Sequence, residues 1–161
     1  MIASFDIGEV NFAYCIGTPE KIATLKHVNV KNHKNQTVLT SCDAISKILL
    51  AENFDNCEKV LIEQQMTRNV RAMCIAQHVW SWFSIVIPRL NPEFVPARIK
   101  TSRGLTYKQR KQEAVDLLMK FMVDHEQCSY VQSLSKKDDV ADAFVQIVRW
   151  CANSDVKMKK C

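Results

Sequence analysis

Glycine is scarce in this chain of 161 residues, which contains only Gly8, Gly17 and Gly104. Actin-like ATPases and sugar kinases also open with a D-x-G strand followed by a hairpin, as residues 6–8 do here. Those enzymes need further glycine-rich loops to hold nucleotide phosphates, and they usually have two domains. Because the chain has no glycines for such loops, we set this class of enzyme aside.

Long hydrophobic runs are also absent. The longest, residues 79–87, is interrupted by two serines and is far shorter than the ~20 apolar residues that a membrane helix needs. The first residues form a strand-like pattern with an acid inside it, which is unlike a secretory signal. We therefore expect neither a membrane anchor nor a secretion signal.

The seven cysteines include no CxxC pair, and the four histidines do not stand at the spacing of metal ligands. No nucleophile signature surrounds any of the cysteines, which argues against cysteine catalysis. We expect reduced, mostly buried thiols in a reducing compartment, and no structural zinc.

Acidic residues are missing between Pro96 and Gln112, while the chain as a whole carries a net charge of +5. Basic residues fill this segment instead, and the tail adds Lys157, Lys159 and Lys160. Such a run is either a solvated face or a surface for nucleic-acid phosphates. Its basic residues are Arg98, Lys100, Arg103, Lys108, Arg110 and Lys111.

Hydrophobic periodicity predicts one α/β domain in which helices flank a mixed five-stranded sheet. Three antiparallel strands come first, and parallel strands follow. Asn69 is expected to cap a helix that is apolar around most of its circumference, as in a core helix or a dimer contact. The expected strands are residues 1–7, 11–17, 21–31, 59–63 and 93–96, and the expected helices are 38–52, 69–87, 107–123 and, after a polar connection, 136–151.

Two acids interrupt apolar strands. Asp6 lies within the first strand and Glu63 ends the fourth. Active sites of such sheets lie beyond the carboxyl ends of the strands, where both side chains are expected. A buried carboxylate needs a partner or a metal ion, because an unpaired charge is costly to desolvate.

Three aspartates begin the last helix. Ser135 and Asp138 have the spacing of a capping box, which explains Asp138 structurally. Asp139 and Asp142 share one helix face, although the spacing also permits a pair of Asp138 and Asp142. Four carboxylates gathered in one place repel each other unless cations bind, and all-oxygen ligands suit Mg²⁺ or Mn²⁺. Two such ions about 4 Å apart can drive in-line displacement at phosphorus.

Four motifs in order resemble those of Holliday junction resolvases of the ribonuclease-H-like, RuvC-type superfamily, and most of all the poxvirus resolvases. They are FDIG (5–8), LIEQQ (61–65), VPARIKTSRGLTYKQRKQEAV (95–115) and DDVADAF (138–144). The resemblance covers nearly the whole chain. It implies a single ribonuclease-H-like nuclease domain over residues 1–161.

The resemblance also implies roles for residues. The catalytic and metal-binding carboxylates fall on Asp6, Glu63, Asp139 and Asp142, which would hold two Mg²⁺ or Mn²⁺ ions per active site. A functional lysine falls on Lys108, with Lys100 as the second candidate, and would offset negative charge near the scissile phosphate. The alternative for either lysine is plain contact with the DNA backbone.

The family's partners are implied in the same way. They are four-way and related branched DNA, and a second copy of the chain bound through helix 69–87 so that two opposed strands are cut. Arg68 and Arg71 are candidates for contacts to the DNA backbone, although an ordinary solvated helix start is the favoured explanation for both. A poxvirus member would act in the host cytoplasm, on joined genome copies. The alternative is a non-catalytic nucleic-acid-binding protein with the same fold.

Overall fold

The computed structural model of the protein describes residues 1–30, 36–97, 104–122 and 125–158, with side chains up to residue 154. Its centre is a five-stranded sheet in the order β3-β2-β1-β4-β5. β1, β2 and β3 are antiparallel neighbours, whereas β4 pairs in parallel with β1 and with β5. The predicted mixed sheet is confirmed. Its strands are β1 (Ile2–Ile7), β2 (Asn11–Gly17), β3 (Ile22–Asn29), β4 (Lys59–Gln64) and β5 (Glu93–Pro96).

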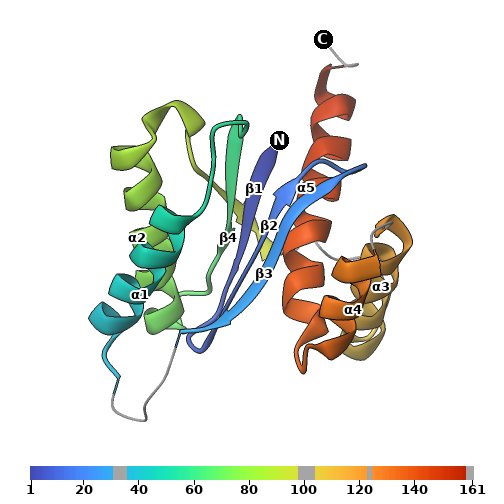
Figure 1. Ribbon diagram of the computed structural model, residues 1–161, viewed down its shortest axis with the longest axis horizontal. Helices are drawn as coiled ribbons and strands as arrows, with labels where there is room; N and C mark the ends of the chain where they lie inside the picture. Colours follow the sequence, from blue (N-terminus) through green and yellow to red (C-terminus); the bar gives the residue numbers. More distant parts are fainter. Residues whose placement is uncertain (31–35, 98–103, 123–124, 159–161) are drawn as a thin grey trace.

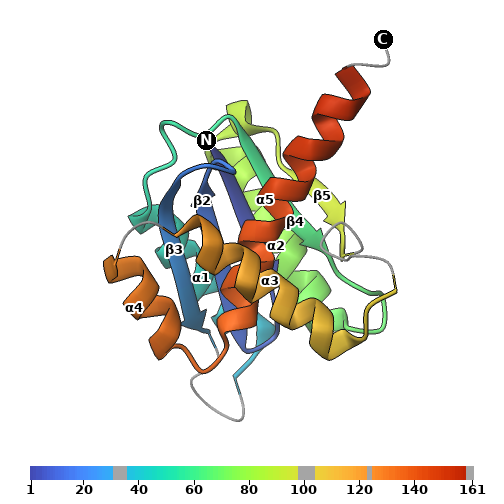
Figure 2. The ribbon, with the colours of Figure 1, turned by 90° about the vertical axis from the view of Figure 1, so that its right-hand side faces the viewer.

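Helices cover both faces of this sheet (Figure 1). On one face lie α1 (Val38–Ala51) and α2 (Val70–Val86), and a short 3₁₀ turn, η1 (Pro88–Leu90), leads from α2 to β5. On the other face α5 (Lys137–Met158) lies directly against β1 and β2. Figure 2 looks onto this second layer, where α3 (Tyr107–Phe121) crosses α5 and α4 (His125–Ser133) stands beside β3.

The sheet has a hydrophobic core on each face, and the side chains of β1 point alternately into one and the other. Ala3, Phe5 and Ile7 point into the core beneath α1 and α2, where Phe5 stacks on Phe12 at 5.7 Å between ring centroids. Ile2 points into the core beneath α5, and Asp6 shares its face because successive strand residues alternate sides. β1 therefore places the carboxylate of Asp6 on the α5 side of the sheet.

Most predicted elements are confirmed to within two residues at their ends. The side chain of Asn69 accepts a hydrogen bond from the Ala72 N–H at 3.4 Å, so the predicted cap of α2 is present. The prediction of a polar connection before the last helix was wrong, because residues 125–133 form the helix α4. α5 also continues to Met158, seven residues beyond the predicted end.

The outer side of α2 carries apolar residues among polar ones such as Gln77 and Ser81. Its inner side buries five residues, from Ala72 to Phe83, whereas Val70, Trp80, Ile85 and Val86 are exposed. Burial in the core explains the apolar residues of the inner side but not the exposed ones. The predicted contact of this helix with a second copy of the chain therefore stays a prediction, and it concerns the outer side. Within the described part of the chain, no helix combines the length and apolarity needed to cross a membrane.

The cysteines are less buried than expected. Of the six described, Cys15, Cys42 and Cys57 are buried, Cys74 is exposed, and the remaining two are intermediate. Burial raises the pKa of the Cys15 thiol, which keeps it protonated. Only three of the six described cysteines are buried, so the expectation of mostly buried ones was wrong for the part that the structure describes, while the expectation of reduced cysteines stays a prediction.

Candidate active site

The register of β1 and β4 brings Asp6 and Glu63 together. These strands run in parallel with Phe5 opposite Ile62, so the next residue on each strand carries the acid. Gly8 then starts the hairpin to β2, with its N–H donating to the Asn11 carbonyl at 2.9 Å. A Cβ at Gly8 would lie 3.0 Å from that carbonyl oxygen, which is tighter than most real contacts. Glycine lets the turn close directly beside Asp6.

α5 supplies the other two acids. It buries Val140, Ala141, Ala143 and Phe144 completely against the sheet and α3. Asp139 and Asp142 are interleaved with these residues but are only partly buried. They therefore lie at the edge of the contact between α5 and the sheet, where the hydrophobic core ends and an open pocket begins.

One pocket of about 720 Å³ is lined by all four predicted carboxylates. Asp6 and Glu63 reach it from the strand ends, and Asp139 and Asp142 reach it from α5. Asp138 does not line it, which favours the pair Asp139 and Asp142 over the other spacing that the sequence allowed. The predicted convergence of these four side chains is thus present in the structure.

The acids in this pocket repel one another. Burial raises the pKa of the Asp139 carboxyl, and the negative charges of Asp6 and Asp138 raise it further. Lys111 and a hydrogen bond from His27 act in the opposite direction without cancelling the shift. Burial and neighbouring acids therefore disfavour the ionised form of Asp139, and a bound cation would relieve this.

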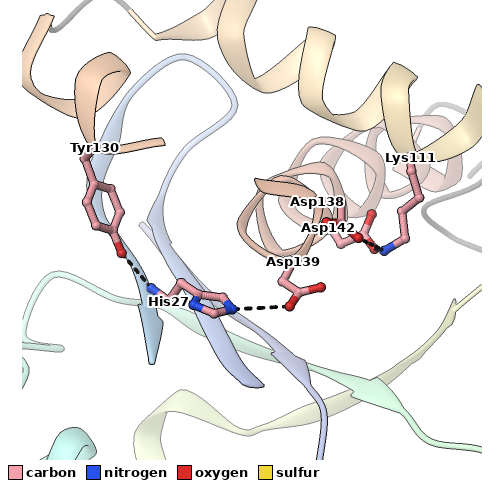
Figure 3. Close-up of polar contacts among 6 residues, drawn as sticks. All are labelled: His27, Lys111, Tyr130, Asp138, Asp139 and Asp142. Carbon is pink, nitrogen blue, oxygen red and sulfur yellow. Dashed lines mark hydrogen bonds and ion pairs between the residues drawn. The ribbon is translucent and has the colours of Figure 1, made fainter. Parts of the chain in front are cut away.

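Lys111 of α3 lies against two of the acids of α5 (Figure 3). Its Nζ lies 2.6 Å from Asp142 Oδ2 and 3.1 Å from Asp138 Oδ2. Burial alone would lower the pKa of Lys111, but the hydrogen bonds and charges of Asp142 and Asp138 outweigh it, so the pKa is raised. Asp138, which the sequence assigned to a helix cap, is thus an ion-pair partner of Lys111.

The structure places Lys111, and not Lys108, in the acidic pocket. Lys108 is exposed and lines a neighbouring hollow together with Ser135 and Asp138. The two lysines lie one turn apart on α3, so only one of them reaches Asp142. The catalytic role assigned to Lys108 stays a prediction, and Lys100 lies outside the described residues.

The other predicted DNA-binding residues divide into three groups. Arg68 and Arg110 line the pocket with the acids. Arg71 instead forms an ion pair with Glu9 at 3.2 Å and donates to the Gln36 carbonyl at 2.7 Å, so it ties the first hairpin to α2. Arg98 and Arg103, like Lys100, fall within residues 98–103, which the structure does not describe.

Three polar residues near the acids were not singled out from the sequence. His27 Nε2 lies 3.3 Å from Asp139 Oδ2, and the Tyr130 hydroxyl accepts a hydrogen bond from the His27 N–H. Gln65 Nε2 donates to Glu63 Oε2 at 3.3 Å. Gln65 could have been found from the sequence, because it belongs to the LIEQQ motif. His27 and Tyr130 are far from every motif, so no signal in the sequence points to them.

The donor set fits a hard divalent cation in its chemistry. Carboxylate oxygens are what Mg²⁺ and Mn²⁺ prefer, and burial together with the nearby acids raises the pKa of Asp139. As placed, no three His, Cys, Asp or Glu side chains of the described residues lie close enough together to hold an ion. Lys111 lies against Asp142 instead, so a cation that engages this acid would have to displace the ammonium group.

Comparisons with known proteins agree with this geometry. Among solved structures, the chain is similar to the fowlpox virus resolvase in its complex with substrate Holliday junction DNA. The TM-score is 0.63 and the identity 19%, with 95% of this chain and 97% of that chain covered, so the likeness establishes the ribonuclease-H-like fold. No curated protein matches closely enough to count as a relative. The family model described as the poxvirus A22 protein matches residues 1–154. The chain therefore belongs to the poxvirus A22 protein family.

Proposed function

We propose that the protein is a divalent-metal-dependent endonuclease that resolves four-way DNA junctions. The observation that carries the proposal is the gathering of four carboxylates, from two strand ends and one helix, in a pocket flanked by basic side chains. Membership of the poxvirus A22 family and the fold shared with fowlpox virus resolvase support the same activity.

In this function Asp6, Glu63, Asp139 and Asp142 would hold two Mg²⁺ or Mn²⁺ ions. Bound there, the ions would supply an activated water and stabilise the leaving oxygen during in-line displacement at phosphorus. Gln65 holds one oxygen of Glu63 through its amide, which orients that carboxylate. Asp6 is fixed by the sheet itself, because it belongs to a central strand.

Basic side chains of the same pocket would receive the DNA. Arg68 and Arg110 approach it from the β4–α2 connection and from α3, and their guanidinium groups suit phosphate oxygens. Lys111, once released from Asp142, can offset negative charge that develops at the scissile phosphate. The segment 98–103 adds Arg98, Lys100 and Arg103 to the proposed DNA-binding set.

Cutting two opposed strands of a junction requires two active sites. We propose that a homodimer provides them and that the outer side of α2 forms its contact, because the apolar side chains of Val70 and Ile85 are exposed there. A poxvirus family member is also expected to work in the host cytoplasm, where joined genome copies would be its substrate.

Junction cleavage by Glu63→Gln tests the proposal. Gln keeps the size of the side chain and loses its charge, so the variant should bind a synthetic four-way junction and fail to cut it in Mg²⁺. Glu58→Gln is the matched control, because Glu58 lies just before the other end of β4 and its side chain is 89% exposed. The control should bind and cut the junction like the parent protein.

The same assay distinguishes the proposed endonuclease from the alternative, a protein that binds junctions without cutting them. Binding without cleavage by the parent protein would support the alternative. Equal cleavage by Glu63→Gln and the parent would remove the assigned carboxylate from the mechanism. Paired incisions within one junction would in addition support the proposed homodimer.

A further inference from the structure

Strand register places His27 in line with the acidic pocket. Asp6 on β1 is paired with Ala13 on β2, and Ala13 is paired with His27 on β3. Directly paired residues of antiparallel strands point to the same face, which here is the face covered by α5. His27 therefore lies on the same face as Asp6, two strands away, at roughly 10 Å by the usual strand spacing.

Asp139 fills the interval between these two residues. It is 3.3 Å from His27, and it lines the same pocket as Asp6, so it lies near both. The residue between them on the sheet is Ala13, which is fully buried and whose methyl group leaves room for the carboxylate. A larger side chain at this position would occupy the space between His27 and Asp6.

His27 reaches Asp139 from outside the pocket. It is not among the residues that line the pocket, whereas Asp139 is. Both side chains are largely buried, at 13% and 17% exposure, so the contact is shielded from solvent. Figure 3 shows Nε2 directed at one oxygen of Asp139, while the other oxygen points away from the imidazole. The contact fixes the carboxylate without occupying its second oxygen.

The backbone of His27 is held as well. β3 is an edge strand, and the His27 N–H donates to the Tyr130 hydroxyl of α4 at 2.9 Å. Without this hydroxyl, the N–H would have no strand partner on the open edge. α4 thereby fixes the position on β3 from which the imidazole extends to α5 (Figure 3).

We infer that His27 is a positioning residue, which orients the Asp139 carboxylate for a divalent cation, and that Tyr130 supports it through the β3 backbone. This inference rests on the proposed metal-dependent function. Metal-ligating carboxylates are commonly held by such outer hydrogen bonds, and loss of one typically weakens metal affinity about 10- to 100-fold. His27 touches neither DNA nor the reacting atoms in this role.

Mn²⁺ binding measured by titration calorimetry tests the inference, with the Mn²⁺ concentration for half-maximal junction cleavage as a second readout. His27→Phe keeps a flat ring and removes the hydrogen bond, and it should weaken Mn²⁺ binding about 10-fold. Its junction affinity without metal should be unchanged. His27→Gln returns an amide donor of similar reach and should restore Mn²⁺ affinity to within about threefold of the parent.

Two further variants sharpen the test. His78→Phe is the matched control, because His78 bonds Ser46 between α1 and α2 on the opposite face, and its Mn²⁺ affinity should equal that of the parent. Tyr130→Phe removes only the hydroxyl and should weaken Mn²⁺ binding less than His27→Phe. If Phe at position 27 prevents folding, His27→Leu removes the same donor with a smaller side chain.

The outcomes separate the inference from the proposed function. A parent protein that binds Mn²⁺ and cuts junctions, with His27→Phe and His27→Leu binding Mn²⁺ equally well, would overturn the positioning role alone. If His27→Phe and His27→Gln weakened Mn²⁺ binding equally, the positioning role would also be overturned. The hydrogen-bond donor that Gln restores would then make no difference, as expected for a purely structural role of His27. A parent protein that neither binds Mn²⁺ nor cuts junctions would overturn both.

Discussion

The ion pairs of Lys111 make the metal-free protein depend on this residue for stability. Its side chain is 25% exposed, and those of Asp142 and Asp138 are 14% and 27% exposed. Exposed ion pairs contribute about 0–1 kcal/mol, whereas removing one partner of a buried pair costs about 3–5 kcal/mol. These half-buried pairs fall between the two, so Lys111→Met should lower the free energy of unfolding by about 2 kcal/mol.

In a protein of this length, that loss corresponds to a fall in Tm of about 4–8 °C. The fall should be seen by thermal denaturation in a chelator and should shrink in saturating Mg²⁺, because the cations then neutralise Asp142 in place of the ammonium group. Lys108→Met is the matched control, since Lys108 lies one turn away and is exposed, and its Tm should not change.

An equal fall in Tm with and without Mg²⁺ would refute this reasoning, because it would mean that the lysine and the cation do not compete for the same acid. An unchanged Tm in the chelator would refute it too, because the ion pairs would then contribute nothing.

Two further predictions concern the pocket acids and the outer side of α2. The raised pKa of Asp139 means that its ionised form destabilises the metal-free fold at neutral pH, and that this cost disappears as the pH falls through the raised pKa. Asp139→Asn should therefore stabilise the metal-free protein by about 1 kcal/mol at neutral pH while abolishing cleavage, with a gain that shrinks in acid; denaturation curves at several pH values check this. Ile85→Glu should leave the fold intact, because Ile85 is 78% exposed, but should separate the proposed dimer, and an unchanged sedimentation mass would contradict it.

Local patterns were sufficient for most of the fold. Each of the five strands carries its own apolar alternation or run between turn residues, and Asn69 marks the start of α2 by its own side chain. The apolar run 59–63 is typical of a central parallel strand, and acids at the ends of such strands are expected at one edge of the sheet. The structure pairs β1 with β4 in parallel and so places Asp6 beside Glu63.

Features that depend on distant packing could not be predicted in this way. α4 buries only Val131, so its polar sequence has no amphipathic pattern strong enough to distinguish a helix from a connection. The choice between Lys108 and Lys111 depends on how α3 is rotated against α5, which spacing along α3 does not define. His27 reaches Asp139 across 112 residues of sequence, through two strand registers and the position of α5.

The two acids of α5 are held by different partners, and this difference bears on how the site would accept metal. Asp142 is held by Lys111 from within the pocket, so a cation must displace its partner. Asp139 is held by His27 from outside the pocket, so its partner can stay in place when a cation binds. Asp139 would thus be oriented before a cation binds, whereas Asp142 would first have to lose its ion pair with Lys111. The ammonium group of Lys111, freed from Asp142, would remain close enough to contact a phosphate bound at the cations.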